Sequence, residues 1–340
     1  METTTTTITT DARTEARTMR AVVHARFGEP RDAVRIEKVV TPTIADDEVL
    51  VAVEASGIAI GDYLTITGQP YIARPMFGIR TPKQLIAGFE MAGTVVATGA
   101  DVKRLAVGDT VLGFGNGTLA QYVALPQGAV VARPANITAE QAAAVPISGL
   151  AALQAVRDTG GVAAGQKVLV VGASGAVGTF AVQIAKALGA EVTGVAGTGN
   201  LAMVRSIGAD HVIDYTSENL TARGEVYDVI IDLAGNRRLK ELRSVLAPTG
   251  TLVLVGGSGG PAAMGFGRTI RAMALNPFLR QTLASFMAKD NGEDLEILTE
   301  MVAAGEIVPV IDRTYPLGRI VDALGHVGSR HTSGKTVITV

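Results

Sequence analysis

Short β-branched segments fill the first part of the chain, and clusters of Gly, Pro and Asp separate them. Segments of this length and composition are typical of strands. We place them at residues 20–23, 34–39, 48–54, 93–97, 107–113 and 121–125. Several short strands at this spacing predict a barrel-like β domain.

The pattern changes near Ala139, where an Ala-rich stretch at residues 140–156 predicts helix interrupted by Pro146 and Gly149. Strand-like and helical segments then alternate, which predicts a parallel, doubly wound sheet. The predicted strands are 168–171, 192–195, 211–213, 229–233 and 251–255, and the predicted helices are 176–188, 201–207, 237–246 and 294–304.

Residues 308–340 return to short strands, and the last one, 336–340, is a natural partner for the first domain. The predicted organisation is therefore α/β with an insertion. Residues 1–18 form a polar, Thr-rich disordered tail. Residues 19–145 and 291–340 form the β-barrel domain, and residues 146–290 form a Rossmann domain within it.

Composition supports two well-packed domains in the 340 residues, because 47% are hydrophobic and 18% are charged. The net charge of −2 and the lack of a basic run give no indication of a nucleic-acid partner. The chain has no Cys, so it has neither a disulfide nor a thiolate metal ligand. This fits a reducing compartment, and we expect a cytoplasmic protein. Residues 168–185 are uncharged, but glycines interrupt them, and we predict a buried strand and helix rather than a transmembrane span.

A glycine turn follows the first predicted strand of the Rossmann domain and precedes an apolar helix. Dinucleotide sites require this context, because the glycines admit the pyrophosphate and the helix N-terminus provides free amides. In the common register the first glycine falls on Ala173, so the motif is a variant. The alternative is a turn that only packs strand on helix. The predicted cofactor residues here are Gly172, Ala173, Ser174, Gly175, Ala176, Val177 and Gly178.

The end of the second strand, at Ala196, carries no acid. An acid at this place usually bonds the ribose hydroxyls of NAD and would repel a 2′-phosphate. We therefore predict NADPH, with NADH also possible. Thr198, Asn200 and Arg205 are the candidate donors, although Arg205 also suits a solvated helix position.

The chain resembles the medium-chain dehydrogenase/reductase superfamily, in its zinc-free, quinone oxidoreductase-like branch. The resemblance spans about residues 19–340 and rests on residues 55–58 with Asp62, 86–93, 107–109, 144–146, 172–178, 206–215 and 334–335. It implies a GroES-like catalytic domain, a Rossmann domain and a cleft between them for nicotinamide and substrate. It also implies a homodimer, and it adds Tyr215 to the predicted cofactor residues.

Zinc members of the superfamily carry Cys and His ligands where this chain has Ala59 or its neighbours and Phe89. We therefore predict no metal site and no zinc-dependent alcohol oxidation. The chain also departs from its own branch. It has Ala59 where Asn is frequent, Ala151 where Thr is frequent, and Asn200 where a basic residue is frequent.

Without a metal, the expected reaction is hydride transfer from NAD(P)H to a quinone or an electron-poor C=C bond. The predicted oxygen-side donors are Tyr63 and then Tyr71, with Asp62 as an orienting group. The alternative is that Asp62 caps the following turn and both tyrosines merely line the cleft. The four histidines show no metal spacing, and we expect them to be structural or exposed.

Gly256 and Gly257 follow a predicted Rossmann strand and are candidates to approach the nicotinamide ribose. Residues 262–288 mix Arg with Met and Phe. Core and interface packing is favoured there, and a lid, a substrate wall or a membrane contact are alternatives. Two functions stay open: a quinone or enone reductase, and a catalytically weak NADPH-binding protein.

Overall fold

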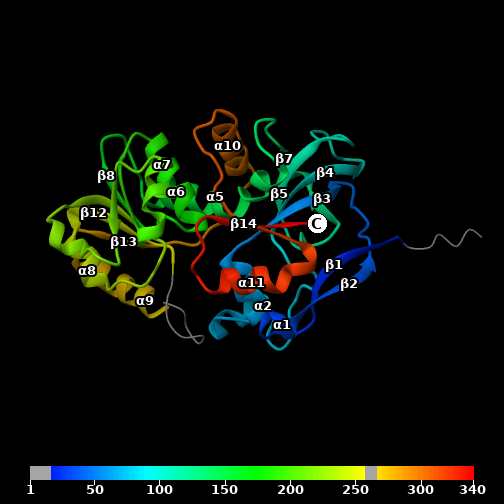
Figure 1. Ribbon diagram of the computed structural model, residues 1–340, viewed down its shortest axis with the longest axis horizontal. Coiled ribbons are helices and arrows are strands. Elements are labelled where there is room, and N and C mark those ends of the chain that lie inside the picture. Colours follow the sequence, from blue (N-terminus) through cyan, green and yellow to red (C-terminus); the bar gives the residue numbers. More distant parts are fainter. Residues whose placement is uncertain (1–16, 257–265) are drawn as a thin grey trace, which may run out of the picture.

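The computed structural model describes residues 17–256 and 266–340, which build two large sheets and one two-stranded sheet (Figure 1). The larger sheet has the strand order β14-β15-β3-β4-β5-β7, and β6 also pairs with β3. Its strands are β3 (Glu48–Ile58), β4 (Glu90–Thr98), β5 (Thr110–Phe114), β6 (Tyr122–Pro126), β7 (Val130–Ala132), β14 (Ile311–Pro316) and β15 (Lys335–Thr339). β1 (Thr18–His24) and β2 (Val34–Val40) form a separate antiparallel pair. β1 begins within the predicted tail, and residues 1–16 of that tail lie outside the described residues.

The end of the chain joins this first domain. β15 pairs antiparallel with β3, with Thr336 opposite Ile58, so the predicted partnership is confirmed. The expectation of strands alone over residues 308–340 is wrong, because α11 (Ile320–Gly328) lies between β14 and β15. Its buried residues recur at helical spacing and pack into the core; they are Ile320, Ala323, Leu324 and Val327.

The second sheet is fully parallel, in the order β10-β9-β8-β11-β12-β13. This is the doubly wound Rossmann order, so the predicted fold class is confirmed. The strands are β8 (Lys167–Val171), β9 (Glu191–Ala196), β10 (His211–Asp214), β11 (Tyr227–Asp232), β12 (Leu246–Leu254) and β13 (Thr282–Ser285).

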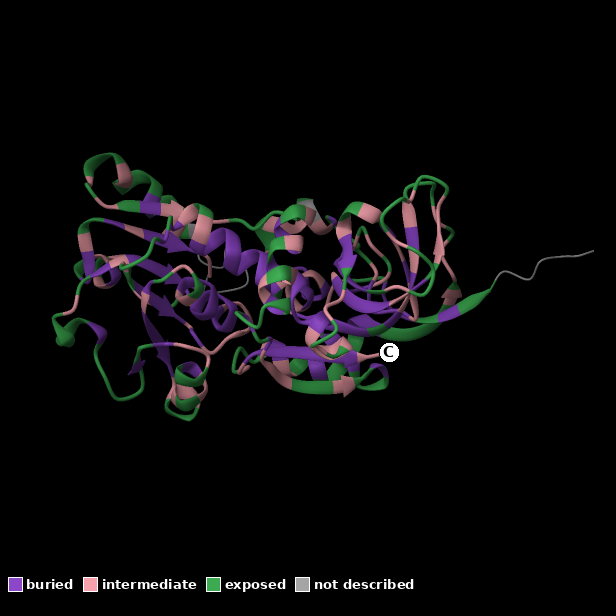
Figure 2. Ribbon diagram, turned by 90° about the horizontal axis from the view of Figure 1, so that it is seen from above, coloured by how far each residue is buried: buried purple, intermediate pink, exposed green. Residues whose placement is uncertain are grey.

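Alternate residues of β8 enter two different core layers, which explains why the strand is apolar throughout. Val168 and Val170 pack in the cluster that contains Phe180 of α6. Leu169 and Val171 pack in the cluster that contains Leu242 of α8. The helices of this domain are α6 (Ala176–Ala187), α7 (Leu201–Ser206), α8 (Leu239–Ser244) and α9 (Phe266–Leu275). Figure 2 shows this buried centre.

The remaining helices lie in the first domain and at the junction. They are α1 (Pro30–Ala33), α2 (Ile60–Thr67), α3 (Arg74–Phe77), α4 (Ala139–Ala143), α5 (Pro146–Leu153) and α10 (Gly292–Ala303), and a π-helical turn (Gln154–Thr159) continues α5. Short 3₁₀ segments are Tyr71–Ala73, Gln127–Ala129, Thr198–Asn200, Leu220–Arg223, Asn276–Phe278 and Leu317–Arg319.

Two local predictions need correction. Gly149 does not interrupt a helix. It lies within α5, where a Cβ atom would stand 3.1 Å from Leu298 of α10, so close packing of the two helices favours Gly. β13 was not predicted as a strand. It pairs with β12 and buries Leu283, so this part of the 262–288 stretch belongs to the sheet. Residues 262–265 lie outside the described residues.

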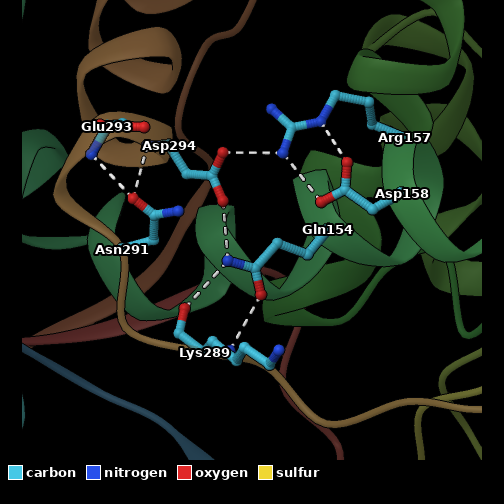
Figure 3. A network of polar contacts seen from close by, with 7 residues as sticks. All are labelled: Gln154, Arg157, Asp158, Lys289, Asn291, Glu293 and Asp294. Atoms are coloured by element: carbon cyan, nitrogen blue, oxygen red, sulfur yellow. Dashed lines mark hydrogen bonds and ion pairs between the residues drawn. The ribbon is translucent and has the colours of Figure 1, made fainter.

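A polar network ties the segment that leaves the Rossmann domain to the end of α5 (Figure 3). The Gln154 amide donates to Lys289 O at 2.9 Å and to Asp294 at 2.8 Å, and Lys289 N donates back to Gln154 at 2.9 Å. Arg157 also binds Asp294, at 2.7 Å. Because Gln154 and Asp294 are buried, these bonds fix the connection between the two domains.

Candidate active site

The glycine turn has the geometry of a dinucleotide site. Gly172 has a φ of +89°, which favours Gly. A Cβ at Gly178 would stand 2.1 Å from the Gly172 oxygen, so only Gly fits where the helix crosses the strand. At Gly175, the N-cap of α6, a Cβ would meet only the Gly172 oxygen, at 3.5 Å. A side chain would thus have room at Gly175, and the amides of the α6 N-terminus are the groups that would hold a pyrophosphate.

The variant position of the motif also has a structural reason. Ala173 is fully buried, and its amide donates to Val195 O at 3.0 Å. Its methyl group faces Gly194, where a Cβ would stand 3.1 Å away. The glycine on β9 therefore provides the space that the Ala at residue 173 occupies.

A carboxylate lies at the end of the second strand after all, but the third strand provides it. The parallel register places Asp214 beside Ala196. Asp214 accepts the Thr198 hydroxyl at 2.6 Å, and the Thr216 amide and hydroxyl at 2.9 and 2.7 Å. These hydrogen bonds, from Thr198 first, hold the pKa of Asp214 below its ordinary value. The Thr198 hydroxyl donates to Asp214 rather than outward, which is a correction to its predicted role as a phosphate donor.

The other predicted residues of the adenosine end lie at the surface. Asn200 Oδ1 accepts the Ser333 hydroxyl at 2.7 Å, which brings the C-terminal segment to this edge. Tyr215 lies over Gly197, where a Cβ would stand 3.3 Å from the phenol oxygen. Arg205 is exposed on α7.

The carboxyl end of β11 holds a buried charge that sequence reasoning missed. Asp232 is fully buried, and it pairs with Arg268 of α9 at 2.5 Å. Gly256 N donates to Asp232 O at 3.0 Å, and a Cβ at Gly256 would stand 1.8 Å from Leu233 O. Gly256 is therefore required for close backbone packing at this edge of the sheet. Gly257 lies outside the described residues.

The C-terminal segment joins the glycine turn to the first domain. Gly334 N donates to Ser174 O at 2.8 Å. The next residue, Lys335, is fully buried, donates to Ser148 Oγ at 2.9 Å and forms an ion pair with Glu90. The other carboxylate oxygen of Glu90 accepts Ile147 N at 2.9 Å, in the first turn of α5. The two domains thus share a buried charged contact beside the turn.

A cavity of about 180 Å³ opens in the first domain, on the residues that precede Glu90. Its lining is mainly apolar and includes Ile66, Ile86 and Phe89. Two of its lining residues each have a buried polar atom without a hydrogen-bond partner among the described residues, Asp62 Oδ1 and His24 Nδ1. An apolar lining with a few polar groups is typical of small-molecule sites, although this cavity is smaller than most of them.

Asp62 holds the start of α2 with one oxygen, since Oδ2 accepts Ala59 N at 2.8 Å. The capping alternative is thus observed, while Oδ1 is buried without a partner among the described residues. The described residues that line the cavity include neither Tyr63 nor Tyr71. The Tyr63 ring packs on Gly328 of α11, where a Cβ would stand 2.5 Å from it. Tyr71 is 51% exposed, and the Arg74 guanidinium stacks 4.7 Å from its ring centroid.

His24 was expected to be structural or exposed, and its place on the cavity was not predicted. It is a lone residue in a strand, and the sequence carries no signal that it lines the same cavity as Asp62. Within residues 17–256 and 266–340, no group of three or more His, Cys, Asp or Glu side chains is arranged to hold a metal ion. None of the helices described here is long and apolar enough to cross a membrane.

Comparison with known proteins defines the class. Residues 45–135 match the alcohol dehydrogenase GroES-like domain, and residues 207–338 match the zinc-binding dehydrogenase family. A chloroplast envelope quinone oxidoreductase homolog from Arabidopsis thaliana is 30% identical over 333 residues, which cover 94% of this chain and 98% of that protein.

Two further relatives agree. An NADPH-dependent alkenal/one oxidoreductase of Arabidopsis thaliana chloroplasts is 29% identical, with 94% of this chain and 79% of that protein covered. The solved structure of the quinone oxidoreductase from Coxiella burnetii is 27% identical, with a TM-score of 0.81 over 95% of this chain and 100% of that chain. The chain belongs to the medium-chain dehydrogenase/reductase superfamily, in its quinone oxidoreductase-like branch, and it is an oxidoreductase of the NAD(P)H-binding type.

Proposed function

We propose that the protein is an NADPH-dependent, zinc-independent reductase of quinones or enones. The cavity on Asp62 and His24 carries the proposal, because an apolar site with two unpartnered polar atoms suits a small carbonyl compound. The nicotinamide supplies a hydride when it is bound. The protein binds the cofactor pyrophosphate at residues 172–178, and the first domain orients the acceptor and excludes water.

The proposed preference for NADPH rests on the end of β9, where Ala196 and Gly197 leave the site without an acid of their own. The Asp214 carboxylate nearby is engaged by Thr198 and Thr216. Gly197 is the position for a test, because Ala196 is buried in the core and Gly197 is only partly covered. A carboxylate there would bond the ribose diol and repel a 2′-phosphate.

We also propose that the protein is a cytoplasmic homodimer. β13 pairs with β12 alone among the described strands, so its outer edge is free to pair with a second copy. Phe278 and Met287 flank it and are 84% and 74% exposed. The cytoplasmic expectation rests on the absence of Cys.

The test is NADPH oxidation with a panel of 1,4-benzoquinone, 3-penten-2-one and 2-hexenal, with metal content measured on the same sample. We expect turnover, no stoichiometric zinc, and a weaker affinity for NADH that Gly197→Asp reverses. Tight NADPH binding without turnover of any acceptor would instead favour a cofactor-binding protein. Loss of activity on chelation of one bound zinc would refute zinc independence.

A further inference from the structure

Asp62 uses its two carboxyl oxygens for different purposes. Oδ2 accepts the Ala59 amide at 2.8 Å and so fixes the side chain at the start of α2. Oδ1 is buried and has no partner among the described residues, and Asp62 is one of the residues that line the cavity. The Asp62 side chain is 3% exposed. The hydrogen bond that Oδ2 accepts therefore also fixes the position of Oδ1. It is therefore the oxygen of Asp62 that is left without a hydrogen bond beside the cavity.

Among the described residues, none of the cationic groups near Asp62 is placed to form an ion pair with its carboxylate. Lys335 on β15 is already paired with Glu90 on β4. Lys83, on the loop before β4, lines the cavity but is exposed to solvent. Burial lowers the pKa of His24 on β1, so its imidazole is neutral near pH 7. An ionised Asp62 would thus be an unpaired buried anion, which is strongly disfavoured.

The protonation state follows from this environment. Burial is the largest cause that raises the pKa of Asp62, and Glu90 adds to it, while the Ala59 hydrogen bond and Lys335 lower it. The result is a pKa of about 7 instead of the ordinary 3.8. A carboxylic acid with such a pKa is suited to general acid catalysis at neutral pH.

We propose that Asp62 is the catalytic acid of this site and that its Oδ1–H donates a proton to the carbonyl oxygen of the bound acceptor. His24 Nδ1 is the second polar contact of that acceptor. The inference rests on the proposed reductase function and deepens it. It assigns the donor role to Asp62 rather than to Tyr63 or Tyr71, because Asp62 lines the cavity and the two tyrosines do not.

The chemistry balances with one proton from Asp62. Addition of a hydride to the β-carbon of an enone breaks the C=C π bond and moves its electron pair onto the carbonyl oxygen. The O–H bond of Asp62 then breaks, and the proton forms the O–H bond of the enol, which tautomerises to the saturated ketone. NADPH would supply the hydride with its electron pair, and the Asp62 carboxylate regains its proton from solvent. For a quinone, the same proton reaches the hydroquinone oxygen.

The test compares wild type with Asp62→Asn, using NADPH and the acceptor panel above. The turnover of wild type should fall about tenfold per pH unit above pH 7, as Asp62 loses its proton. Asp62→Asn should be slower at pH 6 and should lack this descending limb, while its NADPH dissociation constant stays unchanged. Asp294→Asn is the matched control, because it alters a buried carboxylate outside the cavity, and it should keep the limb.

A second readout does not depend on turnover. Since the folded-state pKa of Asp62 lies above the unfolded value, native stability from this group is lost as pH rises through about 7. The urea midpoint of wild type should therefore fall relative to that of Asp62→Asn from about pH 4 to about pH 7 and stay level above it. The inference about Asp62 is overturned, and the proposed function is not, if Asp62→Asn turns over with the descending limb of the pH profile retained. The same holds if the difference between the two urea midpoints does not change with pH. Absence of turnover in wild type with every acceptor overturns the proposed function, and the catalytic role of Asp62 falls with it.

Discussion

Replacement of Lys335 by Met should strongly destabilise the junction of the two domains. Lys335 is fully buried, and its ammonium group binds Glu90 and Ser148. Met has a similar length and no charge, so Lys335→Met removes the cation while it preserves most of the packing. The Glu90 carboxylate, which is 1% exposed, then keeps only its bond from Ile147 N.

The expected cost is that of leaving one buried charge without its partner, about 3–5 kcal/mol. This is a large part of the roughly 5–15 kcal/mol by which domains are stable. Glu90→Gln in the same chain removes the stranded charge, and its amide oxygen still accepts the Ile147 amide proton. The double variant should therefore lose only about 1–2 kcal/mol relative to wild type, the scale of one altered hydrogen bond.

Urea unfolding followed by far-ultraviolet circular dichroism, without cofactor at pH 7, measures both values. The single variant should unfold at a clearly lower urea concentration, and the double variant should recover most of the difference. A single variant within about 1 kcal/mol of wild type would refute the reasoning, since the pair would not then be a buried charged contact. The reasoning would also be refuted if the double variant were no more stable than the Lys335→Met single variant.

Three further outcomes are expected. Gly178→Ala should abolish NADPH binding in a fluorescence titration, because its Cβ would stand 2.1 Å from the Gly172 oxygen; retained affinity would contradict the turn geometry. Gln154→Leu should cost about 1–3 kcal/mol in urea unfolding, because buried partners lose their hydrogen bonds; an unchanged midpoint would be inconsistent with the network in Figure 3. Tyr63→Phe and Tyr71→Phe should keep turnover within about twofold of wild type, since neither phenol lines the cavity; a tenfold loss in either would restore that residue as the donor.

The sequence predicted those elements of the fold whose residues carry a clear local pattern. β8 and the turn after it combine an apolar strand with glycines, and both are found as predicted. β13 escaped prediction because Thr282–Ser285 is short and only Leu283 is deeply buried. α11 was missed among apparent strands, although Ile320, Ala323, Leu324 and Val327 have helical spacing.

The site was harder to predict because it depends on contacts between distant segments. A carboxylate at the end of β9 was sought on that strand, but Asp214 reaches it from β10 through the parallel register. His24 and Asp62 are far apart in sequence, and only the folded first domain puts both on one cavity. The capping role of Asp62 is local and was foreseen as an alternative, whereas the burial of its second oxygen is not visible in any local pattern.

The ion pair of Lys335 and Glu90 at the domain junction also allows a test of the proposed role of Asp62 without a change to Asp62 itself. Glu90 raises the pKa of Asp62, and Lys335 lowers it, although both effects are smaller than that of burial. Glu90→Gln removes the anion and leaves Lys335 without its counter-charge, so the charged form of Asp62 gains stability. The descending limb of the pH–rate profile should then move to lower pH, with the NADPH dissociation constant unchanged. Asp294→Asn should leave the limb in place. A limb that stays at the wild-type pH in Glu90→Gln would mean that the titrating group does not sense this cluster, and Asp62 would not be the acid.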